Sequence, residues 1–507
     1  PRLVSSAASD VYKRQMQGDS QSLNNFNWAW IKFFSSLTVF FLKFAPYQPE
    51  QRFKLNSFNL GINSSEFLGN LPPDSIPINP AWLASDKHCS KEVSPPSSGM
   101  SSLLHAIGAI PNFTDINIFF AKIYSMFKSN KTKKLSLGIV GGGPGSWIGH
   151  VHRISSRFDN QYEIVAGVFS RNVKISTKFG KSIGISPDRC YSNYKEMAEK
   201  ESKRKDGINV VAIMTPPSSH QIIAEKFISK NVNIISDKPF AGNLEQAKKL
   251  FKSIKKNKKI KYALTHNYSA YPMVRQAKIL VERGKIGKVR MINVEYVQDW
   301  SDGSSINSRN AKKKLKWKLD KNIVGSSAVL NEIGSHAYHL AMYISGLKGT
   351  NVFADIKQIS PKIKMDDNAQ VMINFTNGAK GMFWTSVMSR GGVYGLRIRV
   401  YGDKGSLEWV QNDPGYLKLN PLKGAVKLLE RGFHNADFSK NFSRIKFGHP
   451  EGYLDAFANI YKEFAQSLKS KSNKRYFYPD EDEGFETAKF INACKVSSKS
   501  KKWVKIK

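Results

Sequence analysis

A glycine-rich turn between a strand and a helix constrains the fold of this chain more than any other feature. Residues 135–140, LSLGIV, form an apolar run of strand length, and the turn GGGPGSWIG at 141–149 leads into the helical stretch HVHRISSRF. Glycines let a backbone approach a pyrophosphate closely, and a helix N-terminus offers N–H groups and the positive end of a dipole. A second strand-like run, EIVAGVFS at 163–170, completes a βαβ unit. The sequence therefore predicts a dinucleotide-binding domain.

Strand-like and helix-like segments continue to alternate after this unit. We expect strands within 207–217, 231–239 and 261–268, with helices at 220–231 and from 243 to about 257. This alternation predicts a parallel, doubly wound sheet. Ligands bind beyond the carboxyl ends of such strands. The segments Thr215-Pro216-Pro217, Asp237-Lys238-Pro239 and His266-Asn267-Tyr268 should therefore line one crevice.

The end of the second strand usually selects the cofactor. An acidic residue there binds the ribose 2′-hydroxyl of NAD, whereas a basic residue accommodates the 2′-phosphate of NADP. Here the strand ends in Ser170-Arg171, and no acidic residue occurs between Ile164 and Lys181. The residues indicate NAD(P) as the cofactor and favour NADP(H), although Arg171 could equally be a surface charge.

Six ordered motifs make the chain resemble the Gfo/Idh/MocA oxidoreductases from about Leu135 to Val504. These motifs are GIVGGGPGSWIGHVHR, SDKP, THNYSAYPMVRQA, VEYVQDW, NEIGSHAYHL and GHPEGYLDAFANIY. The resemblance implies an α/β Rossmann dinucleotide-binding domain followed by an α+β domain with a large, mostly antiparallel sheet. It also implies a sugar, cyclitol or related polyol as substrate, and a homo-oligomer, either a dimer or a tetramer.

The resemblance carries two catalytic motifs onto this chain. The family's Glu-Lys-Pro matches Asp237-Lys238-Pro239, and its Asp-x-x-x-His matches Glu332 and His336. It therefore implies that Lys238, Glu332 and His336 are catalytic. A histidine suits the transfer of the hydroxyl proton, and a lysine can polarise the substrate oxygen. Asp237 replaces the family's Glu. Glu332 replaces its Asp, and the glycines that commonly precede that motif are partly lost in Gly325-Ser326-Ser327; these last two departures put the identity of the substrate in doubt.

The candidate binding residues lie on the glycine turn, at strand ends or on the expected second domain. The expected cofactor-binding residues are Gly141, Gly143, Pro144, Gly145, Ser146, Ile148, Ser170, Arg171, Thr215, Pro216, Pro217, His220, Asp237 and Lys238. The expected substrate-binding residues are Asn267, Tyr268, Gln298, Asp299, Trp300, Trp317, Lys318 and His449. Each substrate candidate could instead be a packing residue. For His449 and its neighbours, the alternative is that they begin a helix whose N-terminus Glu451 caps and whose dipole it compensates.

No metal site is expected. His336 and His339 stand three residues apart near Glu332, but neither CxxC nor HExxH spacing is present, and His339 alone is better explained as a packed helix residue. The three cysteines, Cys89, Cys190 and Cys494, show no paired spacing. A reducing compartment, and hence a cytoplasmic protein, is the expectation.

The formal net charge of +38 raises a different class of function, binding to nucleic acid or to an anionic membrane surface. Residues 1–131 contain 12 basic and 8 acidic residues, so the excess belongs to the remaining chain. It consists mostly of scattered lysine, whereas base and phosphate recognition favours arginine. We therefore expect neither a specific nucleic acid nor a membrane as partner. A third class, a non-catalytic cofactor-binding sensor, is disfavoured by the presence of both Lys238 and His336.

The first 131 residues are expected to be a poorly structured extension or an artefact. The segment before Met16 resembles translated vector sequence, and 48–125 is rich in Ser, Pro and Asn. Residues 28–47 are the only membrane candidate, but Lys32 and Lys43 interrupt them. We expect the natural protein to start near Met126, a Rossmann domain at 132–263, and the substrate-binding and oligomerisation domain at 264–507.

Overall fold

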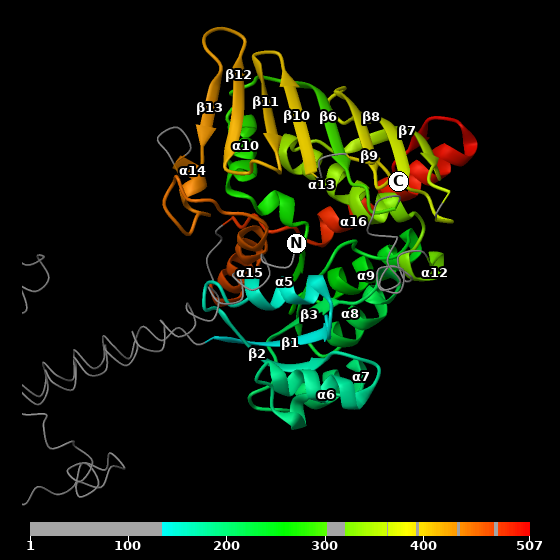
Figure 1. Ribbon diagram of the computed structural model, residues 1–507, viewed down its shortest axis with the longest axis vertical. Coiled ribbons are helices and arrows are strands. Elements are labelled where there is room, and N and C mark those ends of the chain that lie inside the picture. The colour runs from blue at the N-terminus through cyan, green and yellow to red at the C-terminus, as the bar shows by residue number, and fades with distance from the viewer. Residues whose placement is uncertain (1–133, 302–319, 362, 392–394, 433–436, 471–474) are drawn as a thin grey trace, which may run out of the picture. The chain divides into compact units, whose positions relative to one another are not determined.

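The computed structural model describes residues 134–301, 320–361, 363–391, 395–432, 437–470 and 475–507, which contain two sheets (Figure 1). The first 133 residues, and with them the segment at 28–47 and the expected start near Met126, lie outside the described residues. The described residues all belong to one unit of the chain, Ile110–Lys507.

The first sheet has the order β2-β1-β3-β4-β5, and all its strands are parallel. Its strands are β1 (Leu135–Gly141), β2 (Tyr162–Val168), β3 (Val210–Met214), β4 (Asn233–Ser236) and β5 (Tyr262–Leu264). Every residue of β3 and β5 is buried, as expected for strands covered by helices on both faces. The α/β Rossmann fold expected from the sequence is confirmed, and β1 and β3 form the point where the strand order reverses.

Helices connect these strands. They are α5 (Trp147–Ser155), α6 (Val173–Ser182), α7 (Tyr194–Glu201), α8 (His220–Ile228) and α9 (Leu244–Lys256), with 3₁₀ turns η2 (Pro187–Arg189) and η3 (Pro217–Ser219). In α9, Asn243 caps the N-terminus, while Ala247, Leu250 and Ile254 are buried at helical spacing. The exposed lysines of α9, Lys248, Lys249, Lys252 and Lys256, therefore lie on its outer face.

The second sheet has the order β13-β12-β11-β10-β6-β9-β8-β7-β14. Its strands are β6 (Val289–Val297), β7 (Gly349–Lys357), β8 (Asn368–Phe375), β9 (Lys380–Ser386), β10 (Gly395–Gly402), β11 (Gly405–Val410), β12 (Tyr416–Pro421), β13 (Lys427–Glu430) and β14 (Val504–Lys505). The β6–β9 pair is parallel and the other neighbours are antiparallel. The expected large, mostly antiparallel sheet is confirmed.

Helices cover one face of this sheet (Figure 1). The helical elements of this part are η4 (Asn267–Ala270), α10 (Pro272–Glu282), α12 (Lys321–Val324), the π-helix η7 (Leu330–Gly334), α13 (Ser335–Ser345), α14 (Asp437–Lys440), α15 (Tyr453–Lys469) and α16 (Glu481–Ser500). Helix α13 is almost wholly buried between the sheet and α16. The π-helix η7 runs directly into α13, so its residues are joined without a loop to a buried helix.

The last two helices return to the first domain. The Leu264 N–H donates to the carbonyl of Pro479 at 2.8 Å, which extends the edge of the Rossmann sheet beyond β5. Lys255 of α9 forms an ion pair with Glu481 at 2.8 Å. A Cβ at Gly484 would lie 2.6 Å from the ring of Phe240, so α16 packs closely on the first core.

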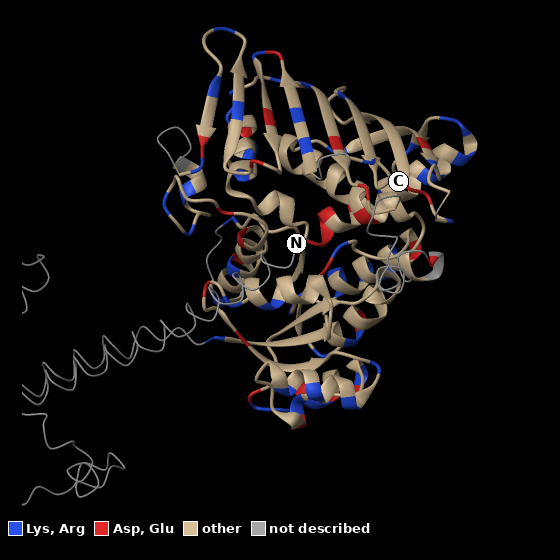
Figure 2. Ribbon diagram, in the orientation of Figure 1, with Lys and Arg blue, Asp and Glu red and all other residues tan. Residues whose placement is uncertain are grey.

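The positive charge of the described residues is distributed over the molecule (Figure 2). Figure 2 shows Lys and Arg spread over elements of both sheets rather than gathered on one of them. None of the helices in the described part of the chain is long and apolar enough to cross a membrane. Cys190 and Cys494 are both buried and free.

Candidate active site

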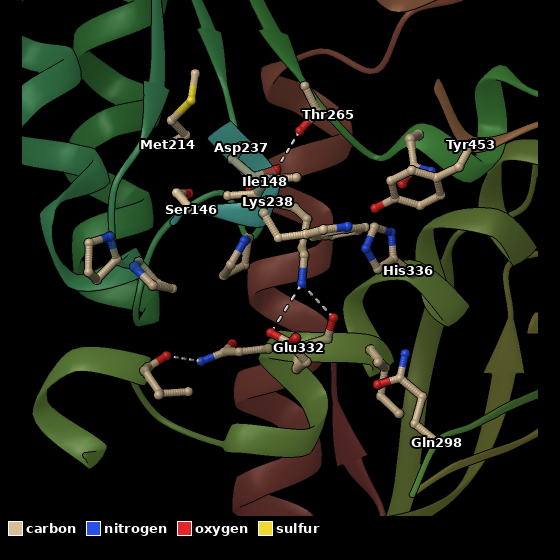
Figure 3. Close-up of a pocket in the computed structure, with 18 of the residues that line it drawn as sticks. Ser146, Ile148, Met214, Asp237, Lys238, Thr265, Gln298, Glu332, His336 and Tyr453 are labelled. Atoms are coloured by element: carbon tan, nitrogen blue, oxygen red, sulfur yellow. Dashed lines mark hydrogen bonds and ion pairs between the residues drawn. The ribbon is translucent and has the colours of Figure 1, made fainter. Parts of the chain in front are cut away.

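A cavity of about 770 Å³ opens at the carboxyl edge of the Rossmann sheet, where the two domains meet (Figure 3). The first domain contributes the segments that follow β1, β3, β4 and β5. The second contributes η7, the start of α13, the end of β6 and the start of α15. The crevice expected at the strand ends is thus present, and residues from both domains line it.

The glycine turn forms one end of this cavity. Gly142 and Gly145 adopt φ values of +63° and +74°, which favour glycine. A Cβ at Gly143 would lie 2.0 Å from the carbonyl oxygen of Phe169, so the turn packs directly against the end of the second strand. Ser146 caps α5 by accepting a hydrogen bond from the Gly149 N–H at 3.1 Å. The first N–H groups of α5 have no acceptor within the helix, which suits a phosphate.

Lys238 follows β4 and points into the centre of the cavity (Figure 3). Its Nζ donates to the backbone carbonyl of Glu332 at 2.7 Å and lies 3.4 Å from the Glu332 Oε2. The side chains of Lys238 and Glu332 are 16% and 26% exposed, so both remain accessible from the cavity. The Lys238–Pro239 peptide bond is cis.

Asp237, next to Lys238, is held by two neighbours. Its Oδ1 accepts a hydrogen bond from the Thr265 hydroxyl at 2.7 Å and lies 3.7 Å from the His152 Nε2. Burial alone would raise the pKa of Asp237, but His152, Lys238 and Thr265 together lower it. The carboxylate is therefore ionised, and it contributes negative charge beside the lysine.

His336 lies at the start of α13, and its ring contacts the cavity (Figure 3). Burial, followed by the positive charge of Lys238, holds the pKa of His336 well below its usual range. The imidazole is therefore neutral near pH 7 and can accept a proton. Glu332 lies in the π-helix η7, and His336 lies in α13, which follows it directly. Such π-turns are frequent at functional sites.

Polar side chains form the wall opposite Lys238. The hydroxyls of Tyr268 and Tyr296 are 2.6 Å apart, and the Gln298 amide donates to Tyr296 at 3.2 Å. Asn267 is fully buried, and among the described residues neither its Nδ2 nor its Oδ1 has a hydrogen-bond partner. Buried amides are normally paired, so this wall suits a ligand that carries hydroxyl or amide groups.

The cavity brings together most of the residues expected at the site. Those that line it are Pro144, Gly145, Ser146, Ile148, Thr215, Pro216, Pro217, Asp237, Lys238, Asn267, Tyr268, Gln298, Trp300, Glu332 and His336. The proposed cofactor and substrate groups thus share one continuous cavity.

Other expected residues lie elsewhere. Gly141, Gly143, Ser170, Arg171, Asp299 and His449 are not among the lining residues, and His449 is exposed. His220 is buried, with its ring nitrogens 2.9 Å and 2.7 Å from the carbonyls of Pro239 and Thr215, so it connects two loops of the site. Trp317 and Lys318 lie outside the described residues.

Sequence reasoning did not assign a site role to several lining residues. Trp147, the first residue of α5, is 65% exposed, and its ring centroid lies 5.3 Å from that of Tyr453. Met214 and Gln411 also line the cavity. Trp147 lies within the glycine-rich sequence, so its position could have indicated a role at the site. Gln411 reaches the site only through the folding of the second sheet.

The described residues contain no group of three or more His, Cys, Asp and Glu side chains that could hold a metal ion. The polar groups of the cavity are a lysine, a histidine, two carboxylates, amides, phenols and aliphatic hydroxyls. Such a set fits an organic ligand held by hydrogen bonds.

The fold and the site define an oxidoreductase with an NAD-binding Rossmann domain. A sequence model for the oxidoreductase family with an NAD-binding Rossmann fold matches residues 135–266, and one for the GFO/IDH/MocA C-terminal domain matches residues 274–408. The chain belongs to the Gfo/Idh/MocA family of oxidoreductases.

Relatives and solved structures agree with this assignment. The uncharacterized oxidoreductase YfiI of Bacillus subtilis is 31% identical over 390 residues, 74% of this chain and 98% of that protein. An oxidoreductase from Sinorhizobium meliloti has 40% identity and a TM-score of 0.66, covering 74% of this chain and 100% of that one. An inositol dehydrogenase homolog from Azotobacter vinelandii, solved with NAD⁺, has 28% identity and a TM-score of 0.69, covering 74% and 98%.

Proposed function

We propose that this protein transfers a hydride between a nicotinamide cofactor and a secondary alcohol or ketone of a sugar, cyclitol or derivative. In this proposal His336 is the acid/base, Lys238 assists, and Glu332 completes the catalytic set. The observation that carries it is that the Lys238 ammonium and the His336 ring line one cavity that continues to the glycine turn. A solved structure adds support, because an inositol dehydrogenase homolog from Azotobacter vinelandii, solved with NADH and myo-inositol, is 27% identical to this chain with a TM-score of 0.67.

A dinucleotide fits the residues at the end of the cavity. Gly143 of the turn packs on Phe169 without room for a Cβ, and the start of α5 presents N–H groups beside Ser146. When bound there, the nicotinamide would supply or accept the hydride. The pyrophosphate would lie against the first turn of α5, and the segment Thr215-Pro216-Pro217 would line the path towards Lys238.

The chain's own residues then handle the proton. In alcohol oxidation, the neutral His336 ring accepts the hydroxyl proton, and Lys238 donates a hydrogen bond to the same oxygen and stabilises its developing charge. Glu332 holds the ammonium through its carbonyl, while Asn267 and the Tyr268–Tyr296–Gln298 chain bind other hydroxyls of the substrate. In the reverse direction the same groups return the proton.

For the cofactor, we propose NADP(H) over NAD, on the basis of Ser170-Arg171. Arg171 is exposed just beyond β2, where a 2′-phosphate would lie in such a fold. The relatives named above include one solved with NAD⁺, so the two cofactors must be compared directly.

We further propose a homo-oligomer, either a dimer or a tetramer, assembled on the outer face of the second sheet. Large apolar side chains are exposed on this face: Met291, Met372, Met382 and Trp384 are between 38% and 60% exposed. The strand register places Met382 opposite Met372 and beside Asn293. Contiguous exposed apolar groups on a sheet are typical of subunit contacts. A Met382→Glu variant should dissociate the assembly in light scattering.

The test begins with fluorescence titrations of the full-length protein with NADH and NADPH. The preferred cofactor is then used in an activity screen of inositols, aldoses, sugar acids and anhydrosugars, in both reaction directions. Tight binding of one cofactor and turnover of one polyol class would support the proposal. Saturable cofactor binding without turnover of any polyol would contradict the catalytic part and favour a sensor on the same fold.

A further inference from the structure

The His336 ring contacts a second buried histidine, His266. The Nδ1 atoms of His336 and His266 are 3.4 Å apart, and the two rings meet edge to face with centroids 5.2 Å apart. His266 is fully buried and follows β5, the last strand of the Rossmann sheet, whereas His336 lies in α13. Neither ring needs to move for one nitrogen to donate to the other.

We propose that His266 is a positioning residue that fixes the ring orientation of His336 and determines which of its two nitrogens carries the proton. The proposal rests on the assignment of His336 as the acid/base. Two neutral imidazoles share a hydrogen bond only when one Nδ1 is protonated and the other is not, so their tautomers are coupled. When the His336 Nδ1–H donates to the His266 Nδ1, the His336 Nε2 is unprotonated and is the nitrogen that can accept a proton from a substrate.

His266 is itself held in place from two sides. Its ring stacks on His339 with centroids 4.3 Å apart and planes at 13°, and the His339 Nε2 lies 3.4 Å from a carboxylate oxygen of Glu483 on α16. Its backbone carbonyl accepts a hydrogen bond from the Ser269 hydroxyl at 2.8 Å. A ring fixed in this way can restrict the motion of its neighbour, which is the condition for precise proton transfer.

The surroundings keep both rings neutral. Burial lowers the pKa of His266 and of His336 well below the usual range, and Lys238 acts in the same direction on both. The other groups that face the pair are Asp237 beyond β4, Glu332 in η7, His339 in α13, Tyr268 in η4 and Tyr296 in β6. Neutral rings are required for the coupling of tautomers, since two imidazolium ions would repel each other.

The test uses full-length protein with ¹⁵N-labelled histidine, and NMR of the ring nitrogens reports the tautomer of His336 without any ligand. His336→Ala assigns its signals. In His266→Phe the stack on His339 is kept but the nitrogen is lost, whereas His266→Asn places an amide near the position of Nδ1. Tyr343→Phe is the matched control, because its buried hydroxyl has no hydrogen-bond partner among the described residues and lies near His339.

The wild-type protein should show one tautomer of His336, with one protonated and one unprotonated nitrogen. His266→Phe should give averaged shifts and reduce kcat at least about tenfold, with KM within about threefold, because the wrong tautomer costs up to about 10⁴-fold in a comparable site. His266→Asn should restore most of both properties, and Tyr343→Phe should leave both unchanged.

The proposal is overturned if His266→Phe keeps a single His336 tautomer and the wild-type kcat. That result, with His336→Ala inactive, would leave the acid/base assignment intact. Full activity of His336→Ala would instead refute the proposed function itself. A kcat loss in His266→Phe with an unchanged tautomer would show a merely structural role and also contradict the inference.

Discussion

Lys238 and Glu332 join the two domains across the cavity, because the lysine ammonium donates to the backbone carbonyl of the glutamate at 2.7 Å. The lysine follows β4 of the Rossmann sheet, and the carbonyl belongs to the π-helix η7. A main-chain carbonyl has no carboxylate to titrate, so this contact does not depend on the protonation of the Glu332 side chain.

Replacement of Lys238 by methionine should lower kcat by about 10²–10³-fold, because an aligned donor to the reacting oxygen is lost. The dissociation constant of the cofactor should change less than about threefold, since the glycine turn is untouched. Stopped-flow turnover and fluorescence titration measure the two quantities. Lys248→Met is the control, because Lys248 is exposed and pairs with Glu245 on α9. Equal losses in both variants would contradict the assignment.

Replacement of His336 by alanine should lower kcat by about 10²–10⁴-fold. In the wild-type protein, burial places the pKa of His336 well below 6.5, so the neutral base persists as the pH falls below that value. The rate of alcohol oxidation should therefore stay level between about pH 8 and 6.5 and fall only at lower pH. A profile that declines with an apparent pKa of about 6.5 to 7 would contradict this environment.

Replacement of Arg171 by alanine should weaken the binding of NADPH by about tenfold and leave the binding of NADH unchanged. The physical reason is the loss of one charge-assisted contact to the 2′-phosphate. Isothermal titration with each cofactor measures the difference, and Lys203→Ala, an exposed basic residue after α7, is the control. If the variant weakened the binding of NADH and NADPH equally, Arg171 would have only a general electrostatic effect.

Replacement of Gly143 by alanine should destabilise the protein and abolish cofactor binding. The added Cβ would lie 2.0 Å from the Phe169 carbonyl oxygen, so the turn must move away from β2. Gly415→Ala is the control, because nothing lies within 4 Å of a Cβ at that position. Thermal unfolding should show a lower midpoint for the first variant alone, and an unchanged midpoint with normal NADH binding would refute the close packing.

The stability of the protein should decrease as the pH falls below about 6.5. Burial lowers the pKa values of His220, His266 and His336, so the unfolded chain binds protons at these positions before the folded chain does. Each such group reduces the free energy of unfolding by about 1.4 kcal/mol per pH unit until its folded-state pKa is reached. Urea unfolding at pH 7.5, 6.5 and 5.5 measures the slope, and His220→Asn should reduce it. A free energy that is constant across this range would contradict the burial argument.

The sequence predicts the dinucleotide fold well because local features encode it. The glycine turn, the buried runs and the helix caps each depend on residues that are neighbours in the chain. Strands β3, β4 and β5 lie within the expected segments, and β1 and β2 each extend one residue beyond theirs. Lys238 could be placed for the same reason, since it directly follows a strand.

The remaining wall of the site depends on contacts between distant residues. Gln411 reaches the cavity only because β10 and β11 pair beside β6. Similarly, no spacing rule predicts that His266 and His336, 70 residues apart, face each other. His449, which opens a promising motif, lies in an exposed segment, whereas Glu451 of the same motif is buried and pairs with Arg431 at 3.1 Å.

The return of α16 to the first domain limits how this protein can be divided. Phe485 packs against Phe251 with ring centroids 4.5 Å apart, and Ala488 belongs to the core beneath the Rossmann helices. A fragment ending at residue 263 would therefore leave that core open to water. For the same reason, a chimaera that takes residues 264–507 from a relative would exchange part of the Rossmann core along with the substrate domain. A design that changes specificity in this way must therefore keep the face of α16 that contacts α9, or change both helices together.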